Sequence, residues 1–203
     1  MMRKDDERTR TRREFLGVAA GLVIASVSEA RAQAGKARAT PACGEGGVAT
    51  LSQTEGPFFK PNSLRRTSLL EPGMAGTRIV VEGAVLTTDC QPVPGALVDI
   101  WQADDQGRYD NAGSRLRGHQ FTDETGRYRL ESIVPGLYPG RTRHFHVKVQ
   151  APHQPALTTQ LYFPGEPANQ RDFIFNPALV MNVREVEGRK LATFDFVLGA
   201  RGR

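Results

Sequence analysis

The sequence predicts an all-β protein, an antiparallel β-sandwich with long loops, over residues 51–203. Six segments carry alternating or continuous apolar residues over the length of a strand. Turn formers rich in proline, glycine and aspartate separate them, as at 91–95, 104–107 and 123–126. No long helical periodicity follows the amino terminus. Short strands at such intervals are typical of two packed sheets.

The predicted strands are, in chain order, 79–87, 96–103, 126–133, 144–151, 159–163 and 190–198. The first two are mainly apolar runs, and the third and fourth alternate, so that one face of each is apolar. The last two also carry alternating or apolar residues. Residues 51–72 and 164–182 are expected to be long loops with little regular structure.

Residues 1–34 are expected to be a twin-arginine export signal. Arg12 and Arg13 precede an apolar run at 15–27 and then alanines at a small-residue cleavage pattern. The run falls short of the roughly 20 residues that span a bilayer. An uncleaved interfacial anchor is the alternative. We expect a periplasmic or extracellular protein with no membrane span after signal removal, in which 35–50 form a linker or amino-terminal arm.

The two cysteines, Cys43 and Cys90, lie in the part expected to be exported, where a disulfide can persist. Our hypothesis is that they pair and join the amino-terminal arm to the first hairpin. An even number of cysteines permits such a bridge without proving it.

The formal net charge of +5 lies partly in residues 1–34. No basic stripe with interleaved aromatic residues is visible, so we expect no nucleic-acid partner. The sequence leaves the oligomeric state open.

The chain has four tyrosines and four histidines, and half of each lie close together, at Tyr109, Tyr138, His144 and His146. Residues two apart in a strand share a face, so the two histidines project together, and Phe145 points to the core. Tyr109 and Tyr138 follow turns. Phenolates with neutral imidazoles form a hard ligand set, which favours Fe(III).

Several motifs around this quartet resemble those of intradiol ring-cleavage dioxygenases, the non-haem Fe(III) enzymes that open catechols. The motifs, with x for any residue, are Thr54-Glu55-Gly56-Pro57-Phe58-Phe59, Gly83-x-Val85, Pro92-x-Pro94-Gly95-Ala96-x-Val98, Gly107-Arg108-Tyr109, Pro135-x-x-Tyr138-Pro139, Arg141-x-x-His144-Phe145-His146 and Thr159-Gln160-Leu161-Tyr162-Phe163. The resemblance covers most of residues 51–203.

The resemblance implies one Fe(III) per chain, held by Tyr109, Tyr138, His144 and His146. It implies that a catechol-type diol and O2 are the substrates, and that both oxygen atoms enter the product. The ring is then cleaved between its two hydroxylated carbons to a muconate-type dicarboxylate. Tyr138 is expected to give way to the diol and to take up one of its protons.

The resemblance also assigns catalytic roles to Arg141, which would stabilise negative charge on the ring, and to Gln160, a polar residue near it. A solvated loop cation and a strand-edge amide are the alternatives. Gly56, Pro57 and Phe58 are expected to form part of the pocket wall.

Only residues 139–143 separate Tyr138 from His144, where well-known members of the family carry a longer insertion. We therefore expect a more open pocket that accepts bulkier catechols. The alternative function is that of a non-catalytic, transthyretin-like or regulatory β-sandwich binding module, because such modules share the Gly-x-Val and Pro-x-x-Gly-Ala pattern. A metalloprotein with another metal or reaction is a third interpretation.

Overall fold

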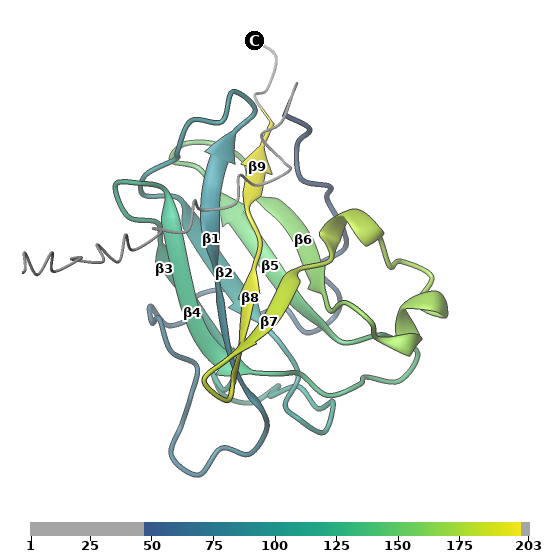
Figure 1. Ribbon diagram of the computed structural model, residues 1–203. Helices are drawn as coiled ribbons and strands as arrows, with labels where there is room; N and C mark the ends of the chain where they lie inside the picture. The colour runs from purple at the N-terminus through teal and green to yellow at the C-terminus, as the bar shows by residue number, and fades with distance from the viewer. Residues whose placement is uncertain (1–46, 200–203) are drawn as a thin grey trace, which may run out of the picture. The chain divides into compact units, whose positions relative to one another are not determined.

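The computed structural model describes residues 47–199, in which two β-sheets pack face to face (Figure 1). The strands are β1 (Arg78–Thr87), β2 (Leu97–Trp101), β3 (Arg117–Phe121), β4 (Arg127–Ile133), β5 (His144–Gln150), β6 (Leu157–Tyr162), β7 (Asn182–Val186), β8 (Arg189–Thr193) and β9 (Phe196–Leu198). One sheet has the order β4-β1-β8-β7, with β9 also paired to β1, and the other has the order β3-β2-β5-β6. The predicted all-β sandwich is confirmed.

The larger sheet is mixed. All pairings of the β3-β2-β5-β6 sheet are antiparallel, whereas β8 and β9 run parallel to β1. The chain leaves β6 in one sheet and enters β7 in the other, so its return through β8 brings it alongside β1 in the same direction. Parallel neighbours need a long connection, and between β1 and β8 the chain passes through every strand of the other sheet.

Two strands lie outside the six predicted segments. Strand β3 (RGHQF) is mostly polar, and strand β7 (NVREV) is largely exposed, so neither carries an apolar pattern. The predicted strand 190–198 is divided into β8 and β9 around Phe194 and Asp195. There the Asp195 carboxylate accepts a hydrogen bond from the Ala84 amide at 2.8 Å, which replaces a backbone pairing. The loop 164–182 contains two short 3-10 helices, η2 (Pro167–Gln170) and η3 (Pro177–Leu179).

The core lies between the sheets and contains the apolar face of β5. Phe145, Val147 and Val149 are fully buried there, as the alternation predicts. Burial of each such side chain contributes roughly 1.5–3 kcal/mol. His144 and His146 therefore point to the opposite face of the same sheet.

Residues 51–60, which we call the strap, cover that opposite face. The Gln53 amide donates to the Thr158 carbonyl at 2.8 Å, and Thr159 Oγ1 donates to the Leu51 carbonyl at 2.7 Å. The strap thus lies along β6, next to the two histidines of β5.

Several predictions lie outside the described residues, namely the export signal, most of the linker and Cys43. The hypothesis of a Cys43–Cys90 disulfide therefore stays a hypothesis. No helix in residues 47–199 is long and apolar enough to cross a membrane.

Candidate metal centre

Strand β5 brings the two histidines together at the covered face of the sheet. His144 Nε2 lies 3.1 Å from His146 Nε2. His144 Nδ1 lies 2.6 Å from the carbonyl oxygen of Thr142, which can only accept. Nδ1 therefore carries the proton, and the lone pair of His144 Nε2 faces His146.

Packing holds the ring of His146. Trp101, on the neighbouring strand β2, is paired with His146, and the two rings stack with centroids 5.0 Å apart and an interplanar angle of 6°. On the strap, Gly56 has a φ of +69°, and a Cβ there would lie 3.1 Å from Cε1 of this imidazole. His146 Nδ1 is buried and has no hydrogen-bond partner among the described residues.

Tyr109 places its hydroxyl beside this pair, 3.5 Å from His144 Nε2. Phe58 of the strap stacks on the Tyr109 ring, with centroids 4.2 Å apart and an angle of 12°. The buried Arg117 holds Phe58 and the residue after Tyr109, because its guanidinium donates to the carbonyls of Phe58 at 2.8 Å and Asp110 at 2.6 Å.

Two glycines bring the loops of Tyr109 and Tyr138 into contact. Gly107 has a φ of +81°, and a Cβ there would lie only 2.0 Å from the Leu137 carbonyl oxygen. The Gly136 amide donates to the Asp104 carbonyl at 2.7 Å. The two tyrosine rings meet edge to face, with centroids 6.0 Å apart.

Burial sets the protonation of these groups. It lowers the pKa of His144 to about 4 and that of His146 well below its usual value, so both imidazoles are neutral at pH 7. Burial also raises the pKa of Tyr109 well above its usual value, so its phenolate needs a nearby positive charge.

The residues fit a hard metal ion. Two nitrogens about 2 Å from one ion and at right angles to each other lie about 3 Å apart, which is close to the observed spacing of 3.1 Å. The described residues contain no group of three or more His, Cys, Asp or Glu side chains that could hold a metal. The tyrosines are therefore needed to complete a four-residue site.

Arg141 lies in a polar network beside the quartet. Its Nε donates to Asp172 Oδ2 at 2.9 Å, and its Nη2 donates to Gln160 Oε1 at 2.5 Å. Gln160 is fully buried, and its Nε2 donates to the Thr54 carbonyl at 2.9 Å. Arg141 thus sits in an ion pair, and Gln160 connects it to the strap.

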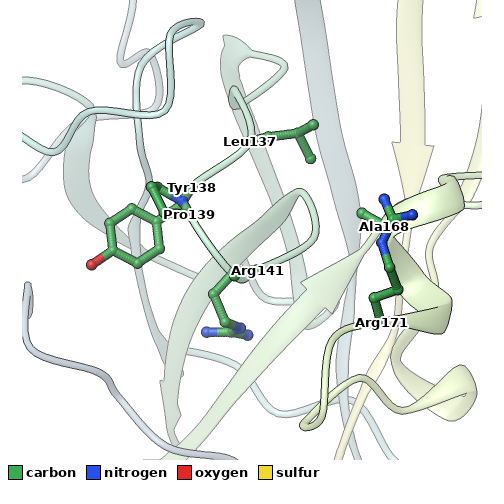
Figure 2. A pocket seen from close by; sticks show the side chains of 7 residues that line it. Leu137, Tyr138, Pro139, Arg141, Ala168 and Arg171 are labelled. Atoms are coloured by element: carbon green, nitrogen blue, oxygen red, sulfur yellow. The ribbon is translucent and has the colours of Figure 1, made fainter.

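A pocket of about 470 Å³ opens beside Tyr138 and Arg141 (Figure 2). Its walls are Leu137, Tyr138, Pro139, Gly140, Arg141, Ala168 and Arg171. The predicted wall residues Gly56, Pro57 and Phe58 are not among them. Gly56 contacts His146, and Phe58 packs on both tyrosines, so these strap residues face the ligand quartet.

Sequence reasoning missed two charged residues of this region, Asp172 and Arg171. Both lie in the segment expected to be an unstructured loop, which has no periodicity to indicate which side chains turn inward. The histidines outside the quartet lie apart from it. His119 contacts Ser63 Oγ at 2.9 Å, and His153 is exposed.

The fold and the site together define a β-sandwich that carries a candidate metal site of two tyrosines and two histidines on one sheet face. The sequence model of the Dioxygenase family matches residues 54–200. The chain belongs to the intradiol ring-cleavage dioxygenase family.

Relatives and solved structures agree with this membership. The dioxygenase domain of a dioxygenase carbohydrate-binding protein fusion from Streptomyces sp. SirexAA-E is 55% identical, with a TM-score of 0.73 over 75% of this chain and 99% of that one. The 3-chlorocatechol 1,2-dioxygenase of Rhodococcus opacus 1CP is 26% identical, with a TM-score of 0.70 over 74% of this chain and 72% of that one.

The hydroxyquinol 1,2-dioxygenase of Nocardioides simplex is 33% identical over 64% of this chain and 52% of its own length. This chain therefore spans about half the length of that relative.

Proposed function

We propose that this protein is a non-haem Fe(III) intradiol dioxygenase. It inserts both atoms of O2 into a catechol-type diol and cleaves the ring between the two hydroxylated carbons, giving a muconate-type dicarboxylate. The observation that carries the proposal is the convergence of His144 Nε2, His146 Nε2 and the Tyr109 hydroxyl, with distances of 3.1 and 3.5 Å. Family membership supports the same reaction class.

Tyr109, Tyr138, His144 and His146 would hold the iron. When bound, Fe(III) supplies a Lewis acid that favours the tyrosine and catechol anions and draws electron density from the diol ring. The neutral state of the buried imidazoles supports this assignment, because metal ligation requires the deprotonated nitrogen.

The surrounding residues act on the substrate. Tyr138 lies at the edge of the pocket, where its phenolate oxygen can take up a proton from an incoming diol. Arg141 keeps a fixed positive charge between the pocket and Gln160, which suits stabilisation of negative charge on the ring. The pocket volume of about 470 Å³ supports substrates larger than unsubstituted catechol.

The place of action is part of the same proposal. The twin-arginine motif at Arg12 and Arg13 supports export, so the protein would meet its diols in the periplasm or outside the cell.

The first test is the visible absorption spectrum of the protein purified in air. Phenolate bound to Fe(III) gives a charge-transfer band, and we expect this band to shift when a catechol is added. Labelled O2 should place both of its atoms in a ring-opened dicarboxylate. A protein that stays colourless after iron is supplied in air would contradict the proposal and favour the non-catalytic binding module.

Substrate size gives a second test. We expect catechols with large ring substituents to be opened at rates comparable with catechol itself. A strict preference for unsubstituted catechol would contradict the open pocket as the determinant of substrate choice.

A further inference from the structure

We propose that Arg171 forms an anion-binding subsite of the pocket, and that the substrates are catechols with a carboxylate on a ring substituent. This inference rests on the proposed function, since it names the substrate class of the same site.

The pocket has room for a substituted ring. Its volume of about 470 Å³ lies within the range of roughly 300–1,000 Å³ that holds drug-sized ligands. Leu137 and Pro139 give it an apolar wall, and both side chains are exposed. A bare catechol would leave much of this wall in contact with water, whereas a substituted one would cover it.

The segment that carries Arg171 is held in place. Three side-chain contacts fix residues 166–172 to residues 141–143, namely Arg143 Nε to Glu166 Oε2 at 2.8 Å, Thr142 Oγ1 to Asn169 Oδ1 at 2.7 Å and Arg141 Nε to Asp172 Oδ2 at 2.9 Å. The backbone position of Arg171 is therefore fixed relative to the pocket. A ligand that binds its side chain loses less conformational entropy than it would by binding a residue on a mobile loop.

Two arginines line this pocket, and Arg171 is the one whose guanidinium donors are free to bind a ligand. Two donor groups of Arg141 are engaged by Asp172 and Gln160. Arg171, by contrast, lines the same pocket, and among residues 47–199 its guanidinium makes no hydrogen bond or ion pair; only its backbone amide is engaged, by the Ala168 carbonyl at 3.0 Å. Its guanidinium offers parallel N–H donors in the geometry that a carboxylate accepts.

The positions of Tyr138 and Arg171 indicate how the substrate lies. Figure 2 shows them on opposite sides of the pocket, with Leu137 and Arg141 drawn between them. A diol bound at Tyr138 would direct its substituent across the pocket, and a carboxylate at the end of that substituent would meet Arg171.

The test compares an acid with its neutral ester. Caffeic acid and its methyl ester share the same diol and side chain and differ in the negative charge. For each protein variant we would measure the ratio of kcat/KM for acid over ester, and, by calorimetry without O2, the ratio of Kd for the ester over Kd for the acid. We expect the wild-type protein to prefer the acid, and Arg171→Gln to reduce both ratios by about tenfold.

Three further variants make the result specific. Arg171→Lys keeps the positive charge but lacks the parallel N–H donors, and it should retain part of the preference for the acid. Arg171→Glu should reverse this preference in favour of the ester. Arg184→Gln removes an exposed arginine from β7, in the other sheet, and should leave both ratios unchanged.

Equal ratios in the wild-type protein and in Arg171→Gln would overturn the subsite, even if catechols are opened. A wild type that binds the acid more tightly than the ester, loses this in Arg171→Gln and opens neither ring would support the subsite and contradict the proposed reaction.

Discussion

The ion pair between Arg141 and Asp172 should be the most costly polar contact of the site to break. The Asp172 side chain is fully buried, and its carboxylate accepts from Arg141 Nε at 2.9 Å, from the Thr142 amide at 2.9 Å and from the Ile174 amide at 3.1 Å. Asp172→Asn keeps the size of the side chain but removes the charge, and it leaves Arg141 without its anionic partner.

The size of the effect follows from burial. Removal of one partner of a buried ion pair costs about 3–5 kcal/mol, because the other charge is left unpaired. Arg141 is 14% exposed and can turn partly toward the pocket, so we expect the lower end, about 3 kcal/mol. With a urea m-value of about 1–3 kcal/mol per molar, the midpoint of unfolding should fall by about 1–3 M.

Urea unfolding of the metal-free protein, followed by the fluorescence of Trp101, measures this loss. Trp101 is the single tryptophan of the chain and stacks on His146, so it reports on this face of the sheet. Glu166→Gln is the matched control. It breaks the more exposed contact with Arg143, and its cost should not exceed about 1 kcal/mol.

A double-mutant cycle with Arg141→Met tests the cause. If the unpaired charge is responsible, Asp172→Asn should cost much less when Arg141 is already gone, with a coupling of about 1–3 kcal/mol. A loss below 1 kcal/mol for Asp172→Asn alone, or strict additivity of the two changes, would refute the reasoning.

The remaining predictions concern the metal ligands and the loops. Tyr109→Phe or His146→Ala should abolish iron-dependent ring opening in assays of O2 uptake, and full activity in an iron-replete His146→Ala protein would break the assignment. The folded metal-free protein holds the pKa of His144 at about 4, against 6.5 for an unperturbed histidine, so the unfolded chain binds more protons as pH falls through this window. Stability should drop by about 3 kcal/mol between pH 6.5 and pH 4, and a His144→Gln protein should show a smaller drop. Gly107→Ala should lower both stability and activity more than Gly188→Ala, because both glycines have positive φ but only the Cβ at Gly107 meets backbone, at 2.0 Å.

The sequence predicted most strands of the sandwich and few of the contacts between its loops. Strands β1, β2, β4, β5 and β6 fall within or close to the predicted segments, because buried faces leave a clear apolar pattern. Strands β3 and β7 carry mostly polar residues, so nothing in their sequence separates them from loops.

In the candidate site, too, local features were predictable from the sequence and long-range contacts were not. The orientation of His144 and His146 followed from the two-residue period of a strand, which is a local property. The 3.5 Å approach of Tyr109 to His144 depends on Gly107 meeting Leu137 and on the strap packing against β6, both of which join distant residues.

The sequence by itself determined the β-sandwich class, the inward face of β5 and the types of side chain in the candidate metal site. Local pattern and residue chemistry suffice for these. Only the tertiary structure decided that Asp172 forms an ion pair with Arg141, that Arg171 borders the pocket and that β8 runs parallel to β1. These arrangements arise from contacts between segments far apart in the chain, whose free energy depends on how all the segments pack and not on the sequence around any one residue.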